Sequence, residues 1–135
     1  EKEDVHDVMV AIVDDASKLQ KASNRIRMYQ VEKITKSIRK ITEINLEACG
    51  HIAKSVMELK DMKNFKNIFD SVKKINKLDR KSDSVFEKAV ADIFENETDA
   101  KNIIKYKEVL ASLDKASDKC KAVARVLEAV AVKHS

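Results

Sequence analysis

The sequence ASLDKASDKCKAVARV, at residues 111–126, has a counterpart one hundred residues earlier, AIVDDASKLQKASNRI at residues 11–26. The two windows align without gaps. Identical residues pair Ala11 with Ala111, Asp14 with Asp114, Ala16 with Ala116, Ser17 with Ser117, Lys21 with Lys121, Ala22 with Ala122 and Arg25 with Arg125. Such dense identity indicates an internal duplication, and its period is too long for a solenoid repeat. The sequence therefore predicts two similar half-domains.

The composition predicts a helical protein. The 135 residues include no Pro, one Gly and no Trp, with 44% hydrophobic and 37% charged residues. Helix formers with almost no turn formers favour long helices. A chain of this length is expected to form one domain with its own core. No run of residues approaches the roughly 18 apolar residues that a membrane-spanning helix needs.

Apolar residues recur three and four positions apart in four segments, at about residues 4–29, 31–59, 65–94 and 99–133. Helices of about thirty residues are about 45 Å long, and short connections between them favour antiparallel neighbours. We therefore expect an all-α fold, an elongated antiparallel bundle of about four long helices.

Smaller signals mark details of these helices. Gly50 interrupts the second segment at a cost of roughly 1 kcal/mol relative to Ala, which predicts close packing or a bend there. We expect Thr98 to cap the fourth helix, with Asp99 in its first turn. Asp61 or Asn64 is expected to cap the third helix.

The charge pattern argues against nucleic-acid binding. The net charge is +4 and the isoelectric point about 9.0, but charges of both signs are interspersed and aromatic residues make up only 4%. A nucleic-acid surface needs clustered basic residues with aromatic or polar base readers. A weak attraction to an acidic membrane surface or partner fits the thin positive excess as well. Cys49 and Cys120 show no zinc-motif spacing, and we predict ordinary buried thiols in a reducing compartment.

Two pairs of aspartates suggest a metal site. Asp79 and Asp83 lie four residues apart in the third predicted helix, and Asp114 and Asp118 lie four apart in the fourth. Residues four apart share one helix face. Counted from the turn near Glu97, the two pairs lie at matching levels of antiparallel helices. Four converging carboxylates would raise each other's pKa, and a hard cation such as magnesium, manganese, iron or calcium would resolve the repulsion.

A simpler interpretation is a solvated, salt-bridged surface, because Arg80, Lys81, Lys115 and Lys119 lie close enough in the sequence to neutralise these aspartates. The first copy of the repeat is poorer in carboxylates. Asp14 and Asp15 are present there, but Lys18 replaces the second carboxylate and itself supplies a positive charge. We expect no comparable site in the first copy.

His51 offers a different chemistry. It lies in Gly-His-Ile-Ala-Lys-Ser, which is similar to the phosphoacceptor helix of histidine phosphotransfer domains, although Ser55 stands where that motif has Gly. A structural histidine is the alternative. The sequence lacks a nucleophile–base pair, a Gly-rich phosphate loop and a Cys/His cluster, so we expect no enzymatic activity.

The segment at residues 86–133 carries three motifs: Asp92-Ile93-Phe94, Ile104-Lys105-Tyr106-Lys107-Glu108 and Leu113-Asp114-x-x-x-Asp118-Lys-Cys-x-x-Val-Ala-x-Val-Leu-Glu. Together they resemble the PhoU-like accessory proteins of low-affinity Pit phosphate transporters. Glu3-Asp4-Val5-His6, followed by Asp14-Asp15, resembles the start of the helix that ends the first half of that family. The resemblance covers essentially the whole chain.

This resemblance implies a pair of related three-helix bundles, with residues 1–29 as the last helix of the first bundle and 31–135 as the second. It implies that Asp79-x-x-x-Asp83 and Asp114-x-x-x-Asp118 are the family's E(D)xxxD motifs, which bind iron or zinc clusters. Two departures stand out: the family's first two helices would precede Glu1, and Lys18 replaces an acidic residue. We expect an apolar face on the first helix, which a homodimer or exchanged helices would cover.

The resemblance also implies a function. We expect a regulator or accessory protein of inorganic phosphate transport, located in the cytoplasm and at most peripheral to the membrane. It would dock on a phosphate transporter or its signalling partner, and hold iron, zinc, manganese or magnesium at Asp79, Asp83, Asp114 and Asp118. Two alternatives are a phosphotransfer bundle that uses His51 and a metal-free helical interaction module.

Overall fold

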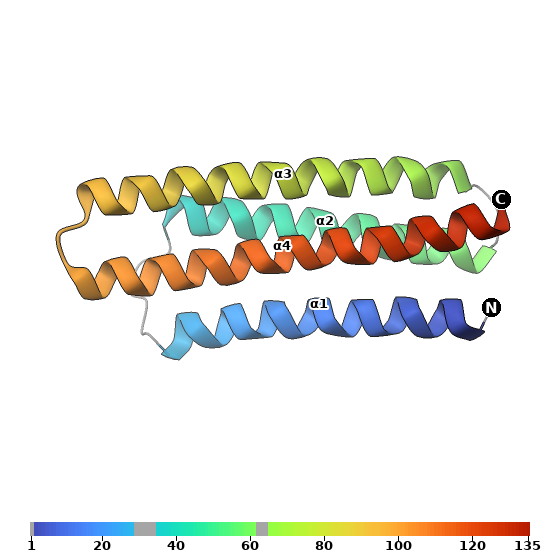
Figure 1. Ribbon diagram of the computed structural model, residues 1–135, viewed down its shortest axis with the longest axis horizontal. Coiled ribbons are helices and arrows are strands. Elements are labelled where there is room, and N and C mark those ends of the chain that lie inside the picture. Colours follow the sequence, from blue (N-terminus) through green and yellow to red (C-terminus); the bar gives the residue numbers. More distant parts are fainter. Residues whose placement is uncertain (1, 29–34, 62–64) are drawn as a thin grey trace.

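The computed structural model describes residues 2–28, 35–61 and 65–135 of the chain. Four α-helices occupy these ranges: α1 (Lys2–Met28), α2 (Lys36–Asp61), α3 (Phe65–Asn96) and α4 (Ala100–His134). They alternate in direction and form an elongated bundle (Figure 1). The described residues contain no strand, so the predicted all-α fold is confirmed. The predicted start of the second helix, near residue 31, lies outside the described residues.

Helix α4 is the central element of the bundle. Helices α2, α3 and α4 each pack against the other two, whereas α1, over its described residues, packs against α4. Figure 1 shows α1 on the side of α4 that faces away from α3. The guanidinium of Arg25 in α1 donates a hydrogen bond to the Ser112 hydroxyl of α4. The arrangement is thus a three-helix unit with α1 laid along one of its members.

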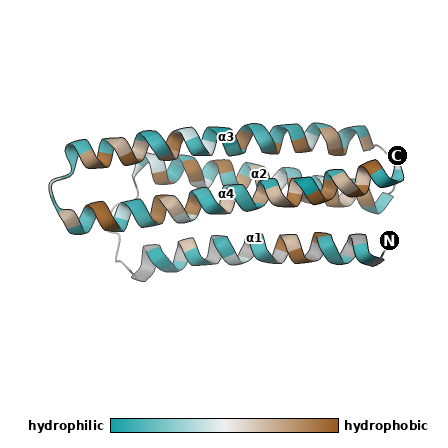
Figure 2. Ribbon diagram, in the orientation of Figure 1, coloured by the Kyte–Doolittle hydropathy of each residue, from teal (hydrophilic) through white to brown (hydrophobic). Residues whose placement is uncertain are grey.

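The buried faces of α3 and α4 follow directly from the sequence. Inward positions on each helix are separated alternately by four and three residues, which is the spacing of coiled-coil seams. On α3 these positions are Ile68, Val72, Ile75, Asp79, Ser82, Phe86 and Ala89, and on α4 they are Val109, Leu113, Ala116, Cys120, Val123, Leu127 and Val130. Hydrophilic residues cover much of the outer side of α3 (Figure 2).

A layer of buried polar side chains divides the core into two apolar clusters. One cluster holds Ile75 and Leu127, and the other holds Ile41 and Leu110. Between them every helix contributes at least one buried polar residue; we call Asp15, Asn45, Asp79, Ser82 and Ser117 the polar layer. Buried polar groups cost free energy unless they are paired. A whole layer of them, drawn from four helices, therefore marks the part of the bundle where function is most expected.

Two smaller predictions need correction. Gly50 is exposed, and a Cβ added to it would meet nothing within 4 Å, so the close packing predicted there is wrong, whereas the alternative of a bend stays a prediction. Asp99, not Thr98, caps α4 by accepting a 2.9 Å hydrogen bond from the Lys101 amide. The Glu97 carboxylate accepts hydrogen bonds from the amides of both Thr98 and Asp99, which places the cap one residue later.

Two residues were candidates for the cap of α3. Asp61 is the last residue of α2 and does not cap α3, whereas Asn64 lies outside the described residues. Among the helices described, none is both long enough and apolar enough to cross a bilayer.

Candidate metal centre

The aspartate pairs of α3 and α4 meet at the seam between these antiparallel helices. Carboxylate oxygens of Asp79, Asp83 and Asp118 all lie within 4.8 Å of one another. Asp114 adjoins this group, because its carboxyl interacts with that of Asp83, which helps to raise the pKa of Asp114. The matching levels counted from the sequence thus place the four side chains together. We call Asp79, Asp83, Asp114 and Asp118 the carboxylate cluster.

Two serines hold the cluster in position through bonds that cross the seam in both directions. Ser117 on α4 donates a hydrogen bond of 3.2 Å to Asp79 Oδ1 on α3. Ser82 on α3 donates a hydrogen bond of 2.9 Å to Asp114 Oδ1 on α4. Each bond occupies one oxygen of its carboxylate. The second oxygen of Asp79 faces the ammonium of Lys121 at 3.7 Å, which a bound cation would replace.

Exposure increases across the cluster from the core to the surface. Asp79 is only 4% exposed, Asp83 and Asp114 are half-buried, and Asp118 is exposed. A cation from solvent can therefore reach the group without a rearrangement of the helices. The buried end, held by hydrogen bonds, provides the fixed geometry that a binding site needs.

Burial and mutual repulsion make the cluster hold protons unusually tightly. Burial raises the pKa of Asp114 to about 7, the neighbouring Asp83 adds to this rise, and the Ser82 hydrogen bond opposes it. Although the residue as a whole is exposed, partial loss of water around the carboxyl group raises the pKa of Asp118 to about 6, with further contributions from Asp79 and Asp83. Loss of water and neighbouring carboxylates are together the causes of these raised pKa values.

The lysine nearest the cluster is not one that the sequence suggested. Lys121 Nζ lies 3.7 Å from Asp79 Oδ2, and its charge lowers the pKa of Asp118 slightly against the other effects. Lys119 instead forms a 2.9 Å ion pair with Asp14 on α1, while Arg80, Lys81 and Lys115 are exposed. Lys121 follows Asp118 by three residues, so both lie on one helix face. This spacing could have predicted that Lys121 lies near the cluster.

The donor set of the cluster suits a hard cation. Magnesium, manganese, calcium and iron take oxygen ligands, and carboxylates are the commonest protein source of them. Three carboxylates that converge without an equivalent number of cations would gain from such an ion. The arrangement can bind and fix a cation.

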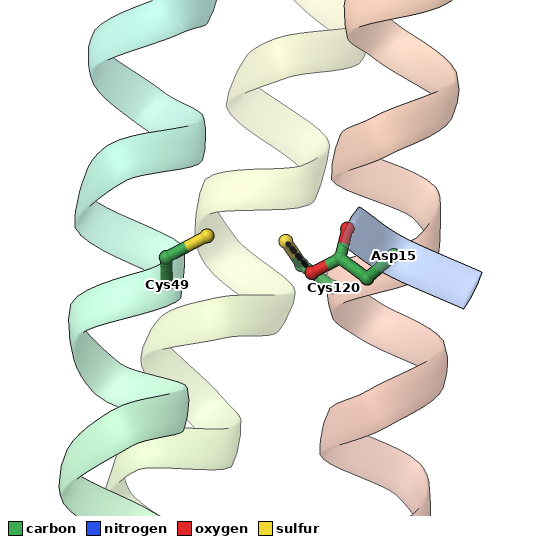
Figure 3. A group of neighbouring side chains, drawn as sticks. All are labelled: Asp15, Cys49 and Cys120. Carbon is green, nitrogen blue, oxygen red and sulfur yellow. Dashed lines mark hydrogen bonds between the residues drawn. The ribbon is translucent and has the colours of Figure 1, made fainter. Parts of the chain in front are cut away.

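The first copy of the repeat is arranged differently, because Asp14 and Asp15 lie on different sides of α1. Asp14 is partly exposed, and its hydrogen bond with Lys119 lowers its pKa. Asp15 is buried and reaches toward Cys49 on α2 and Cys120 on α4 (Figure 3). The two aspartates therefore do not share one site. Lys18, predicted to substitute for a metal, is half-buried and contributes to the lowered pKa of Asp14.

The cysteines are more than isolated core thiols. Cys120 is fully buried and donates a 3.3 Å hydrogen bond to Asp15 Oδ2. The neighbouring Cys49 sulfur, burial and the Asp15 carboxylate all raise the pKa of the Cys120 thiol. The sequence alone does not reveal this group, since its members come from three distant segments. A signal was nevertheless present: Asp15 lies seven residues from both Val8 and Ala22, in the buried line of α1.

His51 lies half-buried on α2, two residues beyond Cys49. The Ser55 hydroxyl donates to its backbone carbonyl, as serines inside helices commonly do. No described contact of the imidazole favours a role as phosphoacceptor, so that role stays a prediction.

Comparison with known proteins adds one relative. No family model matches the chain. Over all 135 residues the chain is 24% identical to the UPF0111 protein YkaA of Bacillus subtilis (strain 168). The match covers 65% of the length of that relative. The similarity is distant, and it extends from the first residue of the sequence to the last.

Proposed function

We propose that the protein is a metal-binding regulator or accessory protein of inorganic phosphate transport, which acts by docking on a transporter or its signalling partner. The observation that carries this proposal is the convergence of Asp79, Asp83 and Asp118 at the α3–α4 seam. These residues, with Asp114, occupy the two Asp-x-x-x-Asp motifs that resemble those of PhoU-like proteins. A motif seen in sequence thus coincides with a site that can hold a cation.

The similarity of the whole of this chain to part of a known protein supports the same assignment. A match over 100% of this chain to a UPF0111 protein is consistent with a distant relation to a PhoU-like family. The all-α bundle is the architecture that such a relation requires. Phosphate transport itself is carried by the resemblance of residues 86–133 to accessory proteins of Pit transporters.

In this proposal the metal has a structural and sensing role. A cation bound between Asp79 and Asp83 on α3 and Asp118 on α4 would neutralise the repulsion among these carboxylates and fix the register of the two helices. Because the cluster extends to the surface at Asp118, binding would also change the charge that the bundle presents to a partner. We place the protein on the cytoplasmic side, where a peripheral regulator meets its transporter.

Phosphate uptake in cells that lack the gene tests this function. Uptake would be compared after complementation with the full-length wild type, with Asp83→Asn/Asp118→Asn and with Asp70→Asn/Glu128→Gln. The last variant makes the same charge change at exposed positions of α3 and α4. We expect the wild type and the control variant to give the same rate of phosphate uptake, and the cluster variant to give a different rate. Uptake that is unaffected by loss of the gene would contradict the proposal.

A further inference from the structure

We propose that Asp15, Cys49 and Cys120 form a second metal site, which binds a thiophilic divalent cation of the zinc class. The three residues come from α1, α2 and α4, and each offers a ligand atom within 4.8 Å of the others. Figure 3 shows the two sulfur atoms facing each other, with the Asp15 carboxylate beside Cys120.

The position of Asp15 is the first argument. It is 5% exposed and occupies the buried line of α1 between Val8 and Ala22, where an apolar residue would pack. Its Oδ2 accepts a hydrogen bond from the Cys120 thiol, a weak donor. Its Oδ1 is buried and has no hydrogen-bond partner among the described residues. Burying a carboxylate with one unpaired oxygen costs folding free energy. A cation bound to Asp15 would neutralise its charge and could coordinate the unpaired oxygen.

The dimensions of the group are the second argument. Zinc binds thiolate sulfur at about 2.3 Å and carboxylate oxygen at about 2.0–2.2 Å in tetrahedral geometry, which separates its ligand atoms by about 3.6–3.8 Å. The Cys120 Sγ to Asp15 Oδ2 distance of 3.3 Å and the 4.8 Å limit on the whole group bracket these values. Small side-chain adjustments would therefore form the site. Three protein ligands leave the fourth position for water.

The donor types separate this site from the carboxylate cluster. Two thiolates select soft or borderline cations such as zinc and cadmium, whereas an all-oxygen group selects hard ones. On binding, the two thiols would release their protons to solvent, and the ion would remain bound to the resulting thiolates. Cys120 follows Asp118 by only two residues, so it projects from a different side of α4. The two sites can be filled independently.

A metal here would have a structural consequence. Among the described elements α1 packs against α4, and the ion would link α1 directly to α2 as well. The position of α1 on the three-helix unit would then depend on zinc. This inference does not depend on the proposed role in phosphate transport.

Titration of the reduced, metal-free full-length protein with Cd²⁺ tests the proposal. Thiolate-to-cadmium charge-transfer absorption should grow to a plateau at one ion per chain. Cys49→Ser and Asp15→Asn should each weaken binding at least about tenfold, since even outer-shell changes cost that much. Asp83→Asn/Asp118→Asn should leave the absorption unchanged. Circular dichroism would establish that each variant is folded. Cys49 is substituted in preference to Cys120 because Cys49 is half-buried and Cys120 is fully buried.

A wild type without charge-transfer absorption would overturn the proposal. So would an Asp15→Asn variant that is folded and binds Cd²⁺ as tightly as the wild type, because the carboxylate would then not be a ligand. Freshly purified protein in which Cys49 and Cys120 form a disulfide and zinc is lacking would overturn it as well. A thermal unfolding midpoint that Zn²⁺ raises in the wild type and not in Cys49→Ser would support it.

Discussion

Ser117 on α4 donates a 3.2 Å hydrogen bond to the buried Asp79 carboxylate on α3, between the two apolar clusters of the core. The reciprocal bond from Ser82 to Asp114 crosses the same seam in the opposite direction. Both bonds belong to the polar layer and the carboxylate cluster that opens from it. Apolar side chains at these positions would stabilise the bundle more than the polar layer does. We therefore attribute the carboxylates and hydroxyls found there to function.

The first prediction concerns the stability of the metal-free protein. Asp118→Asn should raise the free energy of unfolding by about 1 kcal/mol at pH 7.5 in the presence of a chelator, because it removes repulsion with Asp79 and Asp83. Urea denaturation followed by circular dichroism measures this change. The exposed Glu128→Gln on the same helix should change it much less. Destabilisation by Asp118→Asn would mean that the cluster is already neutralised within the fold.

The second prediction concerns pH. Because the folded-state pKa values of Asp114 (about 7) and Asp118 (about 6) exceed the unfolded value of 3.8, the folded state binds more protons between about pH 4 and pH 7. The stability that these groups contribute is present at the acid end of this window and is lost as pH rises through the folded pKa values. The metal-free protein should therefore have a higher melting temperature at pH 5.5 than at pH 7.5.

The control for this pH dependence is Asp114→Asn, which keeps an oxygen to accept the Ser82 hydrogen bond. This variant should show a smaller difference in melting temperature between the two pH values. Equal pH dependence in variant and wild type would assign the effect to other groups, of which Asp15 is the first candidate because burial raises its pKa too.

The third prediction follows from the open surroundings of Gly50. Gly50→Ala should stabilise the protein by roughly 0.5–1 kcal/mol, since Ala is the better helix former and its Cβ would meet no neighbour. Chemical denaturation of the purified variant gives the value directly. A loss of stability would show that close packing, in the protein or with a partner copy, involves this position after all.

The fourth prediction separates two adjacent candidates for the cap of α4. Asp99→Ala should cost about 0.5–2 kcal/mol, because the Lys101 amide loses its acceptor. Thr98→Ala should be nearly neutral, as Thr98 is exposed and only its backbone amide is bonded. Thermal unfolding of the two variants side by side would distinguish them, and the reverse order would restore Thr98 as the cap.

The sequence was most informative where local periodicity and topology sufficed. Apolar spacing identified four helices, and one short turn between α3 and α4 fixed their levels. The sequence alone therefore brings the pair Asp79 and Asp83 to the level of the pair Asp114 and Asp118. The spacing could not show which partner each helix face meets. It therefore did not reveal that Lys119 turns toward Asp14 on α1 or that Lys121 approaches Asp79.

The group of Asp15, Cys49 and Cys120 shows the same limit more clearly. The cysteines have no motif spacing, and the acidic Asp15 on the apolar line of α1 does not by itself indicate which residues it meets. Only the packing of α1 and α2 on α4 brings the three together. The internal repeat relates residues 11–26 to residues 111–126. It does not indicate which residues of other helices they contact.

Binding of Mn²⁺ to the purified protein, measured by equilibrium dialysis, shows whether the carboxylate cluster holds a cation. Manganese favours oxygen ligands and so reports on the carboxylate cluster rather than on the thiols. Wild type would be compared with Asp83→Asn/Asp118→Asn and with the matched control Asp70→Asn/Glu128→Gln. We predict stoichiometric binding to wild type and control, and at least about tenfold weaker binding to the cluster variant. Equal binding by all three proteins, or none by the wild type, would contradict the account.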